Sequence, residues 1–338
     1  MLKSGKLQVI SPLMLGLMLV LVSCRSQTTQ YYSCEGKTQG TMYHITYEYN
    51  TDIHTEIDSI LVAFSASLSN YNPQSVVSKF NNNDSGFVAD TMLIRMINLS
   101  REVWSKTGGM FDITIAPVAN LWGFGWEKVS VPDTTKLSEA LRNMGMDKIV
   151  INGNKVTKTD PNVTIITNGI AQGLSVDCMA EFFEKKGIRN YLIEIGGEIV
   201  AGGTKKNGEM WRIGIDEPIK GSDYSNRVTQ TVINLNGKAV STSGNYRKFV
   251  EMNGSQLGHS LNPKTGYPAT TDMLSATVIA DNCALADAYA TAFMVMGFEK
   301  SMELADKLTG IEVYFIYLGS DNSHKVAYSK GFTNYFAE

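Results

Sequence analysis

Apolar and polar residues alternate from Gly40 to Tyr49, and this period of two predicts a β-strand. Two later segments, Asp52 to Leu68 and Asp90 to Trp104, instead carry apolar residues at the spacing of an amphipathic helix. Lys136 to Met144 suggests another helix. The Asn152-Gly153 step between apolar runs is typical of a hairpin turn.

The second half of the chain alternates between the same two kinds of pattern. Val163 to Thr167 is expected to form a strand that leads into a helix over Ile170 to Lys186, whereas Phe111 to Trp126 looks irregular. Further strands are expected at Tyr191–Ile195, Trp211–Ile215, Val228–Leu235 and Ser275–Ala280, then helices at Ala284–Phe298 and Glu299–Leu308, and two closing strands. This mixture predicts an α+β fold with a largely antiparallel sheet, and no Pro-, Gly- or Ser-rich boundary divides it, so one compact domain is expected.

The N-terminus has the pattern of a targeting segment. Lys3 and Lys6 precede an almost wholly apolar run, Val9 to Val22, which is too short to be a convincing transmembrane helix. The run ends in Leu21-Val22-Ser23-Cys24, which resembles the lipobox of bacterial lipoproteins; an ordinary secretory signal is the alternative. We therefore expect a signal peptide over residues 1–23, lipid on Cys24, and a lipid anchor that holds the protein to a membrane without spanning it.

A flexible tether is expected after Cys24, because residues 25–33 are rich in Ser, Thr and Gln. The expected boundaries are 24–36 for the lipidated cysteine and tether, and 37–338 for the folded domain. The chain has 338 residues, enough for a sizeable core, and a net charge of −3 with mixed signs throughout. That balance gives no reason to expect nucleic acid as a partner.

Cys34, Cys178 and Cys283 remain after Cys24. An odd number without CxxC spacing indicates neither a disulfide framework nor a zinc site. We expect these three cysteines to be packing residues.

Asp287 and Thr291 are four residues apart on an expected helix, so their side chains project from one face. A carboxylate and a hydroxyl form a hard-oxygen pair that suits Mg²⁺ or Ca²⁺. A capping or solvated pair is the ordinary alternative. The alanines at 284, 286, 288, 290 and 292 indicate close packing of this helix, which strengthens the cation interpretation but leaves the ordinary alternative the more common one.

Two polar segments upstream of this helix are candidates for chemistry. His259 precedes an Asn-Pro-Lys-Thr-Gly turn and has the side chain of a general base, although sequence alone slightly favours a strand-end histidine bonded to the turn. Thr242-Ser243-Gly244 presents hydroxyls and N–H groups suited to an anion, or is a simple loop.

Asn168 to Gly173 runs from an expected strand into an expected helix, where unpaired N–H groups favour phosphate. Glycine placed for close packing is the alternative. Tyr71 and the aromatic cluster of Phe111, Trp122, Phe124 and Trp126 are able to stack on a planar ring, but such residues more often belong to a core.

These motifs, in this order, resemble the FAD:protein FMN transferase family, also called the ApbE or thiamin-biosynthesis lipoprotein family. The resemblance covers nearly the whole chain after the signal segment. It rests on Gly40-Thr41, Phe111–Pro117, Gly169–Gly173, Gly196-Gly197, Trp211–Ile215, Thr242–Tyr246, His259–Gly266 and Ala286–Thr291.

The resemblance implies a T-fold-like protein that binds FAD as its substrate together with Mg²⁺. It implies Asp287, Thr291 and the carbonyl of Gly169 as Mg²⁺ ligands, and His259 as the base that deprotonates the acceptor hydroxyl. Nucleotide contacts are implied for the remaining positions of the pattern: Gln39, Tyr71, Phe111, Asp112, Ile113, Ile166, Gln172, Ser243 and Leu261. This sequence departs from the family pattern at four places, with Ile166 for an acidic residue, Gln172 for lysine, Asn262 for aspartate and Gln39 for methionine.

The family splits the FAD pyrophosphate and transfers FMN to a Thr or Ser hydroxyl of a target protein, releasing AMP. The implied partners are extracytoplasmic domains of membrane redox complexes of the sodium-pumping quinone reductase or Rnf type, reached from the periplasmic side of a bacterial membrane. Two alternatives remain open: Mg²⁺-dependent hydrolysis of FAD to FMN and AMP, and a non-enzymatic flavin-binding lipoprotein. If Tyr71 clamps the nucleotide and keeps water out, hydrolysis is expected to be slow.

Overall fold

The computed structural model describes residues 29–338 apart from 83–86, 127–132, 220, 222–225, 246–248 and 253–254. The predicted signal peptide (1–23), Cys24 and the Tyr246 end of the Thr242–Tyr246 motif lie outside the described residues. No helix in the part of the chain that is described has the length and apolar character needed to cross a bilayer.

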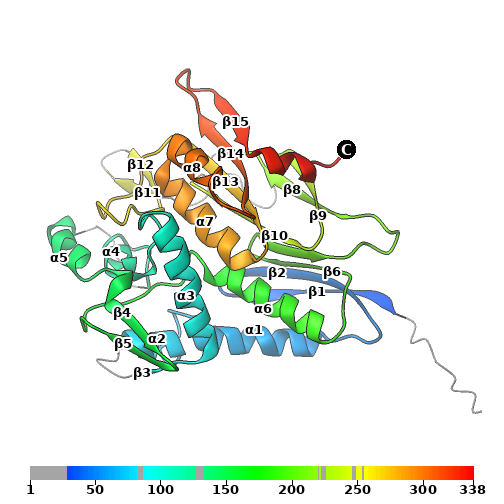
Figure 1. The fold of residues 1–338 in the computed structure, drawn as a ribbon, viewed down its shortest axis with the longest axis horizontal. Coiled ribbons are helices and arrows are strands. Elements are labelled where there is room, and N and C mark those ends of the chain that lie inside the picture. The colour runs from blue at the N-terminus through cyan, green and yellow to red at the C-terminus, as the bar shows by residue number, and fades with distance from the viewer. Residues whose placement is uncertain are drawn as a thin grey trace, which may run out of the picture.

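An antiparallel eight-stranded sheet forms the centre of the molecule (Figure 1), in the order β1-β2-β6-β7-β10-β13-β14-β15. Its strands are β1 Gln30–Thr38, β2 Thr41–Tyr49, β6 Tyr191–Ile195, β7 Glu198–Gly202, β10 Lys238–Gly244, β13 Met273–Ala280, β14 Glu312–Leu318 and β15 His324–Tyr328. Because each neighbouring pair is antiparallel, short turns join several of them, and two of these turns, after β1 and after β6, lie at the same end of the sheet.

Three small sheets complete the strands: β3-β5-β4, β8-β9 and β11-β12. Their bounds are β3 Phe87–Val88, β4 Ile149–Asn152, β5 Lys155–Lys158, β8 Trp211–Asp216, β9 Thr229–Leu235, β11 Phe249–Met252 and β12 Ser255–Gly258. The β4–β5 pair is the hairpin predicted from Asn152-Gly153.

The helices vary from one turn to four. They are α1 His54–Leu68, α2 Val76–Asn81, α3 Thr91–Lys106, α4 Ala116–Leu121, α5 Leu137–Arg142, α6 Ala171–Lys185, α7 Cys283–Met296 and α8 Phe298–Ala305. Short 3-10 helices are η1 Ile113–Ile115, η2 Thr134–Lys136, η3 Met146–Lys148 and η4 Lys330–Tyr335. Thus η1 and α4 occupy the segment 111–126 that the sequence pattern left irregular.

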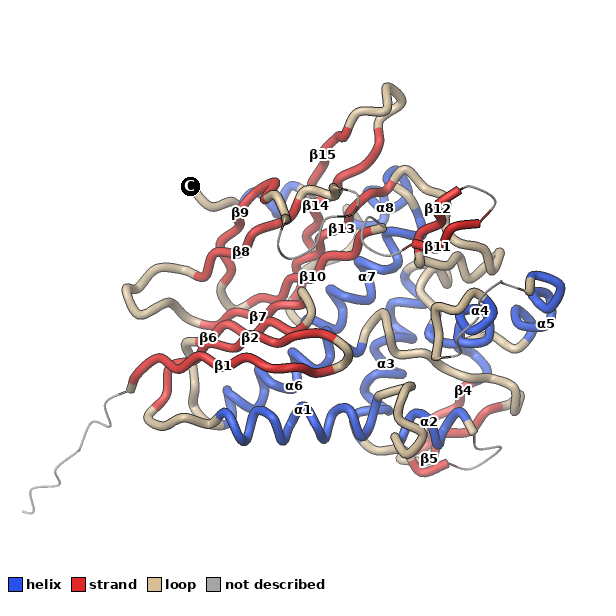
Figure 2. Tube along the Cα trace, turned by 180° about the vertical axis from the view of Figure 1, so that it is seen from behind, coloured by secondary structure: helices blue, strands red, loops and turns tan. Residues whose placement is uncertain are grey.

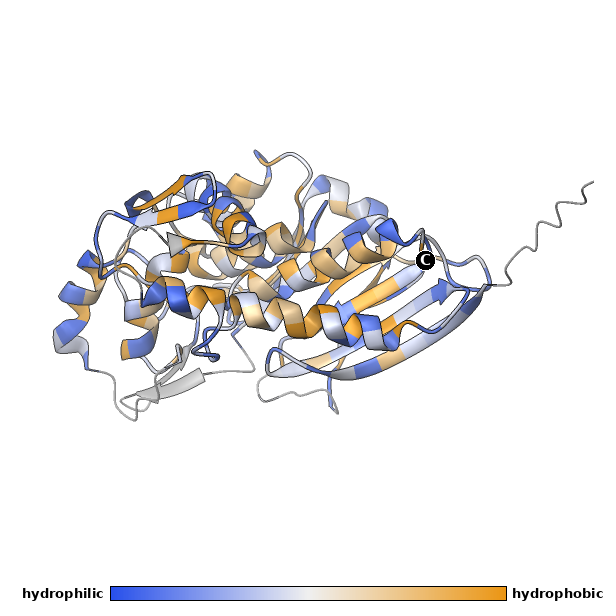
Figure 3. Cartoon of the chain, turned by 90° about the horizontal axis from the view of Figure 1, so that it is seen from below, coloured by the Kyte–Doolittle hydropathy of each residue, from blue (hydrophilic) through white to orange (hydrophobic). Residues whose placement is uncertain are grey.

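The two faces of the large sheet are covered differently (Figures 1 and 2). Helices α1 and α6 pack on the β2–β6–β7 part of one face, with Ile57, Phe183 and Ile193 among the buried residues. Helix α7 covers β10 and β13, α8 contacts β14, and α3 packs against α7. The β8–β9 hairpin and η4 cover the opposite face. In Figure 3 hydrophobic colour is concentrated in the central helices and hydrophilic colour at the outer turns, as expected for apolar stripes turned toward a shared core.

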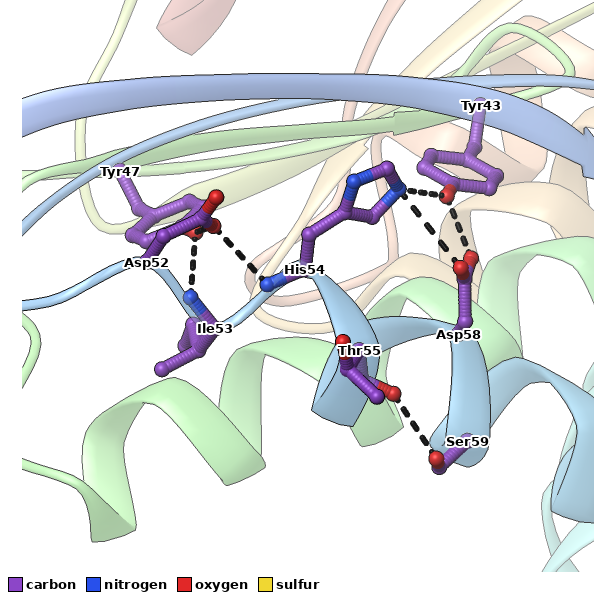
Figure 4. Close-up of polar contacts among 8 residues, drawn as sticks. All are labelled: Tyr43, Tyr47, Asp52, Ile53, His54, Thr55, Asp58 and Ser59. Atoms are coloured by element: carbon purple, nitrogen blue, oxygen red, sulfur yellow. Dashed lines mark hydrogen bonds and ion pairs between the residues drawn. The ribbon is translucent and has the colours of Figure 1, made fainter.

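The start of α1 is fixed to the sheet by polar contacts rather than by a capping side chain at Ile53 (Figure 4). The Tyr47 hydroxyl donates to Asp52 Oδ1 at 2.7 Å and accepts from the Ile53 N–H at 2.9 Å. One turn further, the Tyr43 hydroxyl donates to Asp58 Oδ1 at 2.6 Å and lies 2.9 Å from His54 Nε2. These bonds satisfy N–H groups at the helix start and hold α1 against β2.

Two sequence predictions about local structure need correction. The tether was expected to extend to residue 36, but β1 begins at Gln30 and pairs along its whole length with β2, which has the alternating pattern recognised from Gly40. The segment Val163–Thr167 was expected to be a strand, yet it belongs to no sheet.

Side chains replace a neighbouring strand beside Val163–Thr167. Asn81 bonds both backbone groups of Ile165, at 2.8 and 2.9 Å, and Asn70 Oδ1 accepts from the Thr167 N–H at 2.9 Å. The Ile166 N–H donates to the carbonyl of Ile113 at 2.8 Å. The Asn70 and Asn81 side chains thus bond most of the backbone N–H and C=O groups that a neighbouring strand would otherwise bond. The segment therefore has the residue pattern of a strand without belonging to a sheet.

Candidate active site

Helices α6 and α7 cross at their N-terminal halves, and each supplies a carboxylate to the other. Asp177 of α6 accepts from the N–H groups of Cys283 and Ala284, at 2.7 and 2.9 Å, and so caps the start of α7. Asp287 of α7 accepts from the N–H of Gly173 at 3.1 Å in the first turn of α6. The backbones approach closely, since a Cβ on Gly173 would lie 2.4 Å from the Cys283 carbonyl oxygen.

The three residues proposed for Mg²⁺ come together at this crossing. A Cβ built on Gly169 would lie 3.3 Å from both Thr291 Oγ1 and Thr291 Cγ2, so the Gly169 backbone lies directly beside the threonine. Asp287 lies one turn earlier on α7 and is only 5% exposed. It is therefore no part of a solvated pair, and Asn282 caps its own helix, although Asp287 does accept from an N–H in the first turn of α6.

Burial governs the electrostatics of the crossing. Burial, with the nearby charge of Asp177, raises the pKa of Asp287 to about 7 even though the Gly173 N–H acts in the opposite direction. Burial likewise raises the pKa of Asp177 to about 6, against its bonds to Cys283 and Ala284. Carboxylates with such raised pKa values are those that a cation would stabilise in ionised form.

The donor set fits a hard cation. It combines a carboxylate, a hydroxyl and a backbone carbonyl, all oxygen, and Mg²⁺ commonly takes only one or two carboxylates from a protein and completes its shell with water and phosphate. Among the described residues, no group of three or more His, Cys, Asp or Glu side chains could hold a metal ion. That part of the chain therefore offers no alternative site of the kind that binds zinc.

Two turns of the sheet end beside the start of α6. Gln39 and Gly40 join β1 to β2, and both have positive φ values, +50° and +75°. Gly196, with φ +71°, begins the β6–β7 turn, and a Cβ there would lie 2.4 Å from Gln172 Nε2. The Gln39 Nε2 group is buried without a hydrogen-bond partner among the described residues.

An unpartnered buried amide is costly, so it points to a bound acceptor group. Gln39 stands in the β1–β2 turn, and Gln172, in the first turn of α6, has its amide against Gly196 of the adjacent β6–β7 turn. By contrast, the Gly173 N–H at the helix start is used by Asp287, which corrects the expectation that this whole turn is open to phosphate.

The apolar positions proposed for the nucleotide divide between two core clusters. Phe111 and Ile113 pack in the helix–sheet core, and a Cβ on Gly169 would lie 3.2 Å from the Phe111 ring. Ile166 and Leu261 pack together with α4 and α5. All four are buried, from 2% to 8% exposed, so they form the wall of the site more than its open surface.

Asp112 has a structural task that the sequence did not indicate. Its carboxylate accepts from both the N–H and the hydroxyl of Thr114 and thereby starts η1. Burial raises its pKa despite these bonds. The predicted nucleotide contact of Asp112 therefore concerns a side chain already committed to the fold.

The loop that begins at His259 is held by aromatic and polar contacts. Trp122 Nε1 donates to the carbonyl of Gly266 at 2.7 Å, and the Phe124 ring contacts the His259 ring edge to face with centroids 6.5 Å apart. Ser260 Oγ donates to Asn245 Oδ1 at 3.2 Å, next to the end of β10, whose Ser243 is half-buried. His259 itself is exposed.

Tyr71 is 64% exposed and directly follows Asn70. Since Asn70 bonds Ile165 and Thr167, the position of Tyr71 is tied to the segment that leads into Gly169. The sequence did not predict the roles of four polar residues of this region: Asn70, Asn81, Asp177 and Glu198. Of these, Glu198 alone stands next to a glycine pair, Gly196-Gly197, that marks its position in the sequence.

Two surface pockets of about 350 and 280 Å³ lie away from these residues. Both are lined by Thr29, Glu48 and Asn190, where β1 begins and β2 ends. None of the candidate site residues lines them, so they are no part of the site.

An α+β fold that brings buried oxygen groups together beside amide donors and aromatic residues has the chemistry of a protein class suited to a nucleotide's phosphates. The chain belongs to the ApbE family, whose sequence profile matches residues 39–315. This confirms the family resemblance and the predicted α+β fold.

Individual relatives agree over most of their length. The chain is 36% identical to FAD:protein FMN transferase of Haemophilus influenzae over 334 residues, which is 93% of this chain and 94% of the relative. It is 34% identical to the Vibrio cholerae protein of the same name, over 86% and 88% of the two chains. The solved structure of flavin transferase ApbE from Vibrio cholerae superposes with a TM-score of 0.81 at 32% identity, covering 91% of this chain and 100% of the other.

Proposed function

We propose that this protein is a Mg²⁺-dependent FAD:protein FMN transferase, which attaches FMN through a phosphoester bond to a Thr or Ser of another protein and releases AMP. Family membership supports the reaction. The observation that carries it at the level of this chain is the convergence of Asp287, Thr291 and the Gly169 backbone where α6 and α7 cross.

Those three residues would hold the cation. Bound there, Mg²⁺ would neutralise charge on the pyrophosphate as its P–O bond breaks. Asp287 and Thr291 are held firmly, because α7 packs on both β10 and β13 and the Gly173 N–H bonds Asp287. Preorganised groups of this kind need no rearrangement during the reaction.

The nucleotide would lie between the turns and the aromatic wall. Gln39 and Gln172 would donate hydrogen bonds to it, Ser243 would contribute a hydroxyl, and Phe111, Ile113, Ile166 and Leu261 would line its apolar side. Tyr71, which is exposed, would cover the ring and limit access of water. Gln172 stands where lysine is usual in the family, so a neutral amide donor would replace a positive charge. Ile166 stands where an acidic residue is usual, so a negative charge is missing there.

His259 is suited to serve the protein acceptor. The acceptor oxygen would attack the FMN-side phosphorus, its proton would pass to His259, and the bond to the AMP phosphate would break. A protein side chain can reach only an exposed base, and His259 is exposed in a loop whose position Trp122 and Phe124 hold.

The location follows from the N-terminus. A lipid on Cys24 would anchor the protein on the extracytoplasmic side of a bacterial membrane, where FMN-binding domains of redox complexes of the sodium-pumping quinone reductase or Rnf type are the proposed acceptors. Support comes from the lipobox pattern and from the short stretch between Cys24 and β1.

One experiment separates the proposal from its rivals. Purified protein is incubated with FAD and Mg²⁺, with and without a threonine-bearing acceptor domain, and products are followed by chromatography and mass spectrometry. AMP with FMN-labelled acceptor supports transfer. AMP with free FMN in equal amounts, whether or not acceptor is present, would establish hydrolysis, and intact FAD would establish a binding protein.

A further inference from the structure

A third acidic residue lies beside the proposed cation site. Glu198 is the first residue of β7 and pairs with Ile195, whose side chain faces the helix layer, so Glu198 faces the same layer. It is only 7% exposed. Helix α7, which carries Asp287, packs on both β7 and β10 in this layer.

Glu198 is poorly satisfied by the protein. Its Oε1 accepts one long hydrogen bond, 3.4 Å, from Ser241 Oγ on β10. Its Oε2 is completely buried and has no hydrogen-bond partner among the described residues. A buried carboxylate oxygen without a donor is costly, so a protein retains one only where something else satisfies it.

The start of α7 lies over this part of the sheet. Cys283 Sγ lies 3.7 Å from the carbonyl oxygen of Ile199, the residue after Glu198, and Asp287 follows Cys283 by one helical turn. A cation held at Asp287 would therefore lie on the side of the sheet that Glu198 faces.

We propose that Glu198 is a positioning residue of the cation site: its carboxylate adds negative charge behind Asp287, and its free oxygen accepts a hydrogen bond from the hydration shell of the bound Mg²⁺. The inference rests on the proposed function, since it needs the cation at Asp287, Thr291 and Gly169. Outer-shell groups of this type orient the direct ligands and raise metal affinity.

The chain contains its own control. Glu194 lies across the β6–β7 turn with the same charge, but its carboxylate bonds His44 Nδ1 at 2.7 Å on the face of the sheet away from α6 and α7. Glu198→Gln and Glu194→Gln therefore remove the same charge from the same hairpin on opposite faces. Glu198→Asp keeps the charge and changes only its reach.

Mg²⁺ binding to the purified protein is measured without FAD, by titration calorimetry and by the rise of Tm with added Mg²⁺. We expect Glu198→Gln to weaken Mg²⁺ binding by about 10- to 100-fold, with Glu198→Asp closer to wild type and Glu194→Gln within about twofold of it. Circular dichroism confirms that each variant is folded.

Two outcomes would overturn the inference, and they differ in what else they overturn. If Asp287→Asn abolishes binding while Glu198→Gln binds Mg²⁺ like wild type, Glu198 is a neutral buried acid bonded to Ser241, and the proposed function stands. If wild-type protein shows no Mg²⁺ binding, the cation site itself is wrong, and the metal requirement of the proposed function fails with it.

Discussion

Single atoms decide the geometry of the candidate site. Gly169 has no side chain at the point where one would meet Phe111 and Thr291, and Gln39 adopts a left-handed conformation that favours glycine. The two-residue turn between β1 and β2 requires the left-handed conformation of Gln39, and the close approach of Phe111 and Thr291 requires glycine at 169.

Gly169→Ala tests the first of these positions. The added Cβ would lie 3.2 to 3.3 Å from Phe111 and Thr291, so the threonine must shift by a few tenths of an ångström. We expect AMP release to fall by about tenfold or more, while the free energy of unfolding falls by only about 1–2 kcal/mol.

Gly214→Ala in β8 is the matched control, because its Cβ would make only ordinary contacts of 3.4 to 3.5 Å with Thr229. Its AMP release should equal that of wild type. Equal rates for both variants would show that Thr291 does not take part in the reaction.

Gln39→Gly separates stability from binding. Removing a left-handed glutamine should raise the free energy of unfolding by up to about 1 kcal/mol, because glycine adopts this conformation without strain. The affinity for FAD should fall, because the buried Nε2 donor is lost. Chemical denaturation and fluorescence titration with FAD measure the two effects, and unchanged FAD affinity would remove Gln39 from the site.

At the scale of elements, the reciprocal contact of α6 and α7 builds the site. Asp177 caps α7, and Asp287 bonds the first turn of α6, so neither helix can shift without disturbing the proposed cation ligands. The small residues Gly173 and Ala284 allow this close crossing. The same contact buries two carboxylates, which gives the fold a pH dependence.

Asp177→Asn tests that dependence. The pKa of Asp177 is about 6 in the folded protein, above its ordinary 3.8, so between these pH values the folded state holds more protons than the unfolded state. Stability from this group is therefore present below pH 4 and lost as pH rises to about 6, by up to about 3 kcal/mol.

The carboxamide introduced by this substitution does not titrate, so the variant should lack this contribution. The measurement is urea denaturation of both proteins at pH 4, 5, 6 and 7. The difference in unfolding free energy, wild type minus variant, should decrease up to about pH 6 and then stay constant. A difference that does not change with pH would show that Asp177 is ionised throughout.

At the scale of the whole molecule, β1 links the expected anchor to the site. Only residues 25–29 separate Cys24 from Gln30, a span of roughly 20 Å when extended. The 9 residues of β1 then extend about 30 Å to the Gln39–Gly40 turn beside the site. A lipid anchor on Cys24 would therefore hold the molecule by one end of its sheet and leave the site at the other (Figure 1).

Cys24→Ser tests this arrangement. We expect the variant to leave the membrane fraction, because no lipid can be attached, yet to label an isolated acceptor domain at the wild-type rate, because the site lies at the far end of β1. Cell fractionation and the FMN-transfer assay measure the two properties. A variant that stays membrane-bound would require another means of attachment.

Much of the fold followed from local pattern. The helices of 54–68, 91–106, 171–185 and 283–296 and most strands were predictable, because an apolar stripe or alternation reports directly which face is buried. Residues 30–36 and 163–167 were not, because pairing partners far along the chain decide whether an extended segment joins a sheet. β2 recruits the first segment, while Asn70 and Asn81 hold the second outside any sheet.

For the site, the sequence by itself determined the kinds of groups and one spacing: a carboxylate and a hydroxyl one helical turn apart, and the ordered motifs that place the chain in the ApbE family. Only the tertiary structure decided that Gly169 lies against Thr291, that Asp112 serves as a cap, and that Glu198 is buried facing the helix layer. Helical spacing is a property of neighbouring residues, whereas burial, desolvation and the meeting of charges depend on how distant segments pack.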